Sequence, residues 1–71
     1  MNQVAPKKLL NSKWTSTQPI NRAKHFAVVT VKFDEDGKVM LCELEAVLSK
    51  KIEAIDWRDL KDSTRWKQGW K

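Results

Sequence analysis

The sequence predicts an α+β domain that is mainly β, with a three-stranded antiparallel meander and short C-terminal helical turns packed on it. Two apolar runs, residues 25–33 and 38–48, have the alternation of half-buried strands, and an Asp-Gly pair lies between them. Helix-capping residues return only after residue 55. With 71 residues the chain has room for one domain, for which we expect residues 7–71, preceded by a flexible tail at residues 1–6.

The first strand is predicted over residues 25–33, which are rich in β-branched and aromatic side chains. Strict alternation would place Ala27, Val29, Val31 and Phe33 on one face. The next residues, 34–37, read Asp-Glu-Asp-Gly. Because glycine accepts a positive φ, Asp-Gly between two apolar runs is a strong hairpin signal.

The second strand begins near Lys38, and its even-numbered positions from Met40 to Leu48 alternate with polar ones. From residue 44 the pattern is ambiguous, because apolar residues over 44–55 also fit the stripe of a helix. We favour a turn near residues 49–51 followed by a third strand over residues 52–56, because a third strand stabilises a hairpin. The helix over 44–55 stays open as the alternative.

Two helical turns are predicted toward the C-terminus. Asp56 can cap a turn over residues 57–61, and a second turn over 64–68 would end at Gly69. Trp66 and Trp70, spaced i, i+4, would then share one side of the second turn. At the other end, residues 7–19 lack a clean period and are expected to form an extended or looped arm. Leu9, Leu10 and Trp14 could pin it to the core, and Leu10 and Trp14 are favoured as its anchors.

The composition excludes most catalytic chemistry. The chain has one histidine, one cysteine and two glycines, too few for a structural zinc site or a phosphate-binding loop. His25 opens an apolar strand and Cys42 alternates with apolar residues, so structural or surface roles are expected for both. We therefore expect no enzyme activity, no cofactor and no metal. The acidic residues 34–36 resemble the start of a calcium loop, but the apolar strand pattern that follows favours the hairpin.

The location is expected to be cytoplasmic. No signal peptide and no apolar run long enough to cross a membrane is visible, and a single cysteine suits a reducing compartment. The net charge is +5, and residues 1–24 carry five basic and no acidic side chains. A basic patch can attract polyanions, although lysines also keep small proteins soluble.

Four tryptophans lie beside basic residues, mostly near the two ends. Aromatic rings next to cations are how sequence-tolerant proteins bind single-stranded nucleic acid, although core packing is the competing role of every tryptophan. Core packing is favoured for Trp57 and Trp66, and is left open for Trp14 and Trp70. The candidate contacts to nucleic acid or a partner are Lys13, Trp14, Arg22, Lys24, Arg58, Lys67 and Trp70.

Several motifs together resemble a small tryptophan-rich family of uncharacterised bacterial proteins. They are Leu9-Leu10-Asn11-Ser12-Lys13-Trp14-Thr15, then Pro19, Asn21-Arg22-x-Lys24-His25-Phe26 and Leu44-Glu45-Ala46-Val47, and finally Trp57-Arg58-x-Leu60-Lys61-Asp62 and Trp66-x-x-Gly69-Trp70. The resemblance spans residues 7–71 and implies a bacterial, cytoplasmic, single-domain protein. It implies no substrate, cofactor or functional residue.

Two functions follow as hypotheses. The first is a basic module that binds nucleic acid through the tryptophans and cations near its ends. The second is a module for protein interaction or assembly, including a homodimer, because Trp and Arg are enriched in interface hot spots and small sheets expose edges that pair.

Overall fold

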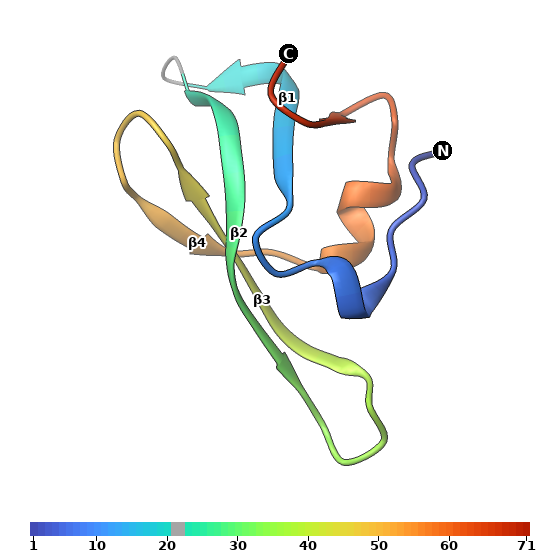
Figure 1. Cartoon of the computed structure of the whole chain (residues 1–71). Helices are drawn as coiled ribbons and strands as arrows, with labels where there is room; N and C mark the ends of the chain where they lie inside the picture. The colour runs from blue at the N-terminus through green and yellow to red at the C-terminus, as the bar shows by residue number, and fades with distance from the viewer. Residues whose placement is uncertain (21–22) are drawn as a thin grey trace.

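A computed structural model describes residues 1–20 and 23–71 of the chain, apart from the side chain of Ile20. It shows one five-stranded antiparallel sheet with the strand order β4-β3-β2-β1-β5 (Figure 1). Two short 3-10 turns, η1 and η2, accompany the sheet. The elements are η1 Pro6–Lys8, β1 Lys13–Ile20, β2 Ala23–Phe33, β3 Val39–Ala46, β4 Ile52–Ala54, η2 Trp57–Lys61 and β5 Trp66–Gln68.

The mainly-β prediction is confirmed, but the sheet is larger than the predicted three-stranded meander. Strands β1 to β4 follow one another as antiparallel neighbours, and η2 lies between β4 and β5 in the chain. β5 then pairs with β1, at the opposite edge from β4. In Figure 1 the chain ends lie at one end of the molecule and the β2–β3 hairpin projects toward the other.

The predicted β2–β3 hairpin is confirmed. Gly37 has φ +78°, and its N–H donates to the carbonyl of Asp34 over 3.0 Å. The carboxylate of Asp34 also accepts hydrogen bonds from the backbone N–H groups of Asp36 and Lys38, each 2.9 Å long. The turn is therefore held by its own acidic residues, as expected for a tight turn that contains Asp and Gly.

A β-bulge in β2 changes which side chains reach the core. Val28 pairs with Leu44 and Thr30 pairs with Glu43, so Val29 has no partner of its own. Such an extra residue shifts the alternation by one position. Val28 and Val31 therefore both pack in the core, whereas Val29 is exposed. The strict alternation predicted for this strand is wrong beyond Val28 for this reason.

Residues 13–20 form a strand instead of the predicted arm. β1 lies between β2 and β5, with Trp14 opposite both Phe26 and Gln68. Its own sequence contains Ser16, Gln18 and Pro19, which weaken the local strand signal. Hydrogen bonding to β2 on one side and to β5 on the other therefore stabilises the strand conformation despite this weak local propensity.

The predicted second helical turn, over residues 64–68, is also wrong. Residues 66–68 form β5, in which Trp66 lies opposite Ser16 and Lys67 opposite Thr15. The first predicted turn is present as η2, where the Asp56 side chain accepts a hydrogen bond from the Arg58 backbone N–H. Residues 44–55 are strand, turn and strand, so the helical alternative for them is wrong as well.

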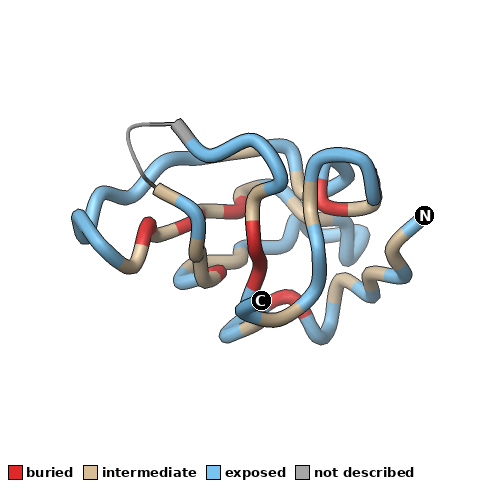
Figure 2. Tube along the Cα trace, turned by 90° about the horizontal axis from the view of Figure 1, so that it is seen from above, coloured by how far each residue is buried: buried red, intermediate tan, exposed pale blue. Residues whose placement is uncertain are grey.

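The core lies between one face of the sheet and the turns η1 and η2, and Figure 2 shows its buried residues in the interior of the trace. Trp14 belongs to it, with 2% of its surface exposed, and its Nε1–H donates to the Ser12 hydroxyl. The N-terminal contact comes from Leu9, which is fully buried, and not from Leu10, which is 52% exposed. The fully or nearly fully buried apolar residues of this cluster are Leu9, Trp14, Val28, Cys42, Leu44 and Leu60.

The first residues of the chain contact the core from outside. The side-chain amide of Asn2 donates to the carbonyl oxygens of Leu60 and Trp66, at 2.9 and 2.8 Å. Its backbone N–H donates to the Lys61 carbonyl. These bonds tie the predicted flexible tail, residues 1–6, to η2 and β5; its mobility stays a prediction.

Candidate functional site

The face of the sheet opposite the core carries an aromatic ring among basic side chains. Directly paired residues of antiparallel strands project from the same face, so His25, Thr15 and Lys67 form one row across β2, β1 and β5. Lys13 lies two positions before Thr15 and therefore on the same face. Trp70 lies against this row. We call Lys13, His25, Lys67 and Trp70 the Trp70 face.

Trp70 is half-exposed and held in one orientation. Its Nε1–H donates to the carbonyl oxygen of Phe26 in β2 over 3.0 Å, and 46% of its surface remains accessible. The Lys13 ammonium lies over the ring, 4.7 Å from the ring centroid, which is a cation–π contact. The His25 ring lies beside it, with centroids 6.0 Å apart and planes inclined by 38°.

Thr15 fixes the backbone on both sides of Trp70. The Thr15 hydroxyl donates to the carbonyl of Gly69 at 2.7 Å and accepts from the N–H of Lys71 at 2.9 Å. Gly69 has φ +80°, the left-handed conformation that turns the chain out of β5 and across β1. His25 adds a further contact: its Nε2 lies 3.0 Å from the main-chain oxygen of Lys71, and this hydrogen bond requires the tautomer with the hydrogen on Nε2.

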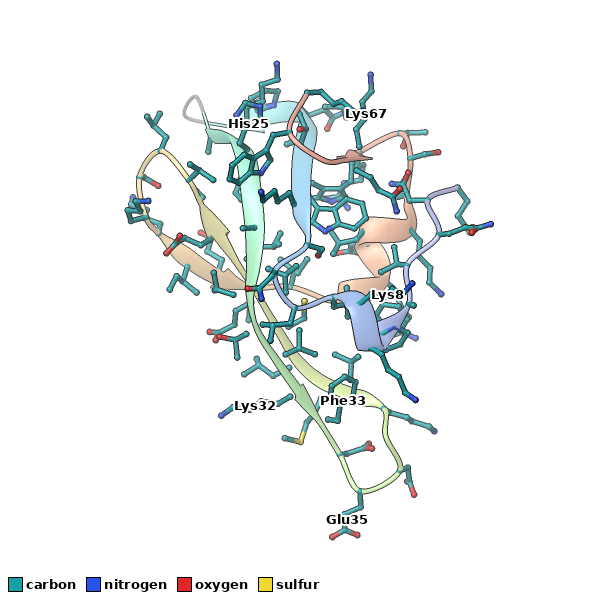
Figure 3. The ribbon with its side chains drawn as sticks, viewed as in Figure 1. Lys8, His25, Lys32, Phe33, Glu35 and Lys67 are labelled. Carbon is teal, nitrogen blue, oxygen red and sulfur yellow. The ribbon has the colours of Figure 1, made fainter. Side chains whose placement is uncertain are left out.

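The charge on the Trp70 face is not neutralised by ion pairs. Within residues 1–20 and 23–71, the ion pair found is that of Arg58 with Asp56, so Lys13 and Lys67 have no acidic partner there. Glu45 of β3 lies in the same row as Lys13, with Ala27 of β2 between them. Figure 3 shows Glu35, in the acidic turn of the β2–β3 hairpin, at the end of the molecule opposite His25 and Lys67.

The structure brings together three of the predicted contact residues: Lys13, Lys67 and Trp70. Trp14 is corrected to the core, because its ring faces Leu9 and Leu60 and not solvent. Lys24 is exposed but alternates with His25, so it projects from the other side of β2. Arg58 is exposed on η2, where both of its bonded nitrogens contact the Asp56 carboxylate. Arg22 lies outside the described residues.

Three residues of the site were not among the contact residues predicted from the sequence. Thr15 and Gly69 position Trp70, and His25 packs beside it, although the sequence indicated only a structural or surface role for His25. The single available signal was their position next to a tryptophan or a lysine in the motifs quoted above. Nothing local reveals that Thr15, fifty-four positions before Gly69, bonds to it.

A recess separate from the Trp70 face is lined by residues of β3 and η2. It has a volume of about 590 Å³ and is open to solvent. Val39, Leu41, Ile55 and Trp57 contribute apolar lining, and Arg58 also lines it. Cys42 is among its lining residues and is nearly fully buried, and burial with the nearby carboxylates of Asp56 and Glu43 raises the pKa of its thiol. This recess is not continuous with the residues of the Trp70 face.

Among residues 1–20 and 23–71, no group of three or more His, Cys, Asp or Glu side chains could hold a metal ion. No described helix is long and apolar enough to cross a membrane.

These features define a small antiparallel β-domain that presents a fixed tryptophan among basic residues. The model of the family described as Tryptophan-rich protein (DUF2389) matches residues 12–71. The chain belongs to this tryptophan-rich family, as the motifs indicated. No curated protein and no solved structure matches the chain.

Proposed function

We propose that this domain binds nucleic acid through the Trp70 face. We further propose that it acts in the cytoplasm and has no catalytic activity. The observation that carries the proposal is Trp70 itself, half-exposed and held between Lys13 and His25 with Lys67 in the adjacent row. A large exposed aromatic ring costs free energy in water, and here several bonds hold it in place. Cations beside such a ring attract phosphates and the ring attracts bases.

Salt dependence is the signature of this mode of binding. Each lysine that contacts a phosphate releases condensed counterions, so affinity falls as salt rises. Removing one such lysine should reduce the slope of log affinity against log salt by about 1. Lys13 and Lys67 are the two lysines that the register places in the Trp70 face.

The test is fluorescence anisotropy with a labelled single-stranded oligonucleotide over a series of salt concentrations. We expect binding at low salt, weakened by Lys13→Ala and by Lys67→Ala. Lys32→Ala is the matched control, because Lys32 is an exposed strand lysine at a distance from His25 and Lys67 (Figure 3). Absence of binding to any oligonucleotide at low salt, or equal loss with Lys32→Ala, would contradict the proposal.

A protein-interaction module is the second candidate, and one observation favours it. β4 is an edge strand of three residues, all exposed, and Ile52 at its start is 51% exposed. An unpaired strand edge can accept a strand from another chain. Light scattering during size-exclusion chromatography would reveal a homodimer. A monomer at high concentration that captures no partner from cell extract would count against it.

A further inference from the structure

We infer that the ligand of the Trp70 face is a single strand of nucleic acid, and that one of its bases stacks on the exposed part of the Trp70 ring. This inference rests on the proposed function and adds to it the strandedness of the ligand and the atom group that recognises the base.

Part of the Trp70 ring is exposed to solvent. Its Nε1 edge points at the Phe26 carbonyl, and the Lys13 ammonium occupies one face. Trp70 is 46% exposed, and the His25 ring lies beside it with centroids 6.0 Å apart and planes inclined by 38°, so part of the ring remains accessible to solvent. A base can stack on this accessible part while the Lys13 ammonium stays over the ring.

The ring is also fixed before any ligand arrives. Its Nε1–H is bonded to β2, and the Thr15 hydroxyl bonds the backbone of the residues before and after it. A fixed aromatic ring loses little conformational freedom when it binds, so more of the stacking energy appears as affinity. Lys13 and Lys67 are diagonal neighbours on the face, about 7–8 Å apart at the backbone. Both can therefore reach phosphates next to one stacked base.

A duplex fits this domain poorly. In a duplex the base faces are covered by neighbouring base pairs, so a ring whose Nε1–H is bonded to the sheet cannot stack on them without unstacking the duplex. Major-groove recognition uses an α-helix or a two-stranded ribbon, and the described residues form no α-helix. The β2–β3 hairpin is ribbon-shaped, but its tip carries Asp34, Glu35 and Asp36, which phosphates repel.

The ligand provides the sharpest control. We would compare labelled oligothymidylate with an abasic strand of the same length, which keeps the phosphates without the bases, and with the corresponding duplex. Oligouridylate provides the RNA arm. We expect the oligothymidylate and oligouridylate to bind about tenfold or more tightly than the abasic strand, as one stacked base would give. The duplex should also bind more weakly than the single strand.

The protein provides a second control. Trp70→Leu should lower the affinity for oligothymidylate to that for the abasic strand, and leave the affinity for the abasic strand unchanged. Trp70→Phe keeps a ring face and should recover part of the loss. Trp57→Leu, at the separate recess, should leave the preference for bases unchanged. In NMR titrations the indole N–H signal of Trp70 should shift and that of buried Trp14 should not.

The outcomes separate the two proposals. Equal binding of oligothymidylate and abasic strand, equal or tighter binding of the duplex, or no effect of Trp70→Leu would overturn the stacking inference. Each of these would leave salt-dependent phosphate binding, and with it the proposed function, standing. If the unaltered protein bound none of these oligonucleotides, the proposed function itself would be refuted. The comparison of ligands uses the unaltered protein, so it decides the question even if a Trp70 variant does not fold.

Discussion

Replacing Thr15 by valine tests whether the hydroxyl of Thr15 holds Trp70 in place. Valine has the shape of threonine and suits a strand, so the change removes one oxygen and its two hydrogen bonds, to Gly69 and to Lys71. Thr15 is 3% exposed, so water cannot readily replace the hydroxyl. The carbonyl of Gly69 and the N–H of Lys71 lose this partner, and the segment that carries Trp70 is loosened.

The expected loss of stability is about 2 kcal/mol, from two hydrogen bonds worth about 1 kcal/mol each. The loss is smaller if the segment from Gly69 to Lys71 detaches and leaves the rest of the sheet folded, because the freed groups then reach water. In both cases Trp70 becomes more accessible. We expect red-shifted tryptophan emission, greater quenching by iodide and faster exchange of the Lys71 amide hydrogen.

Thr17→Val is the matched control for this experiment. Thr17 lies on the same strand, and its hydroxyl makes one hydrogen bond, to the Thr64 carbonyl, away from Trp70. Urea unfolding would measure stability, and iodide quenching would measure exposure of Trp70. If Thr15→Val left both quantities equal to those of the unaltered protein, or if Thr17→Val changed quenching as much, the role assigned to Thr15 would be wrong.

Three further predictions concern the glycine turns, the loss of stability at acidic pH and the reactivity of Cys42. Gly37→Ala and Gly69→Ala should each cost about 1 kcal/mol in urea unfolding, because both glycines have positive φ, but Gly69→Ala alone should also weaken oligonucleotide binding. Hydrogen bonds from Arg58 and from Thr64 lower the pKa of Asp56 and of Asp62, respectively. A lowered folded-state pKa stabilises the fold above the unfolded pKa, and this stability is lost as pH falls through the folded value. The melting temperature should therefore fall on acidification below the ordinary carboxyl range, and less steeply in the Asp56→Asn/Asp62→Asn double variant. Cys42 is buried and its thiol pKa is raised, so a thiol reagent should modify it slowly in the native protein and rapidly in urea; fast native modification would contradict this.

The parts of the fold that the sequence predicts are those with local causes. The hairpin at Asp34 and Gly37 depends on neighbouring residues, and the cap at Asp56 depends on a residue two positions away. The alternation along β3 is regular from Leu41 to Ala46, so its buried side chains could be assigned correctly. In each case the residues that determine the structure are only a few positions apart in the sequence.

The parts that could not be predicted have distant causes. β5 is three residues long, too short to show alternation, and the spacing of Trp66 and Trp70 matched a helix better. Their different environments come from the turn at Gly69, which separates a tryptophan packed on Phe26 from one bonded to its carbonyl. The bulge at Val29 shows only in the register with β3.

The candidate site follows the same rule. Basic residues beside tryptophans were visible in the sequence, and Lys13, Lys67 and Trp70 do meet on one face. Trp14 and Trp70 have the same side chain, and Trp14 is buried because it lies on the core face of β1, in the cluster that includes Leu9 and Leu60. Thr15 carries no sign of its role until Gly69 and Lys71 are placed against it.

The pairing of β5 with β1 has a consequence for how the domain forms. Trp14 and Gln68 are opposite each other although most of the chain separates them. Closing so long a loop costs entropy that only the finished sheet repays, and proteins with distant pairings fold slowly. The β2–β3–β4 hairpins can assemble early from neighbouring segments, whereas β1 acquires its second partner only after residues 66–68 have been synthesised. Until β5 pairs, the sheet is incomplete, and the edge of β1 that β5 later covers is open to pairing with another strand.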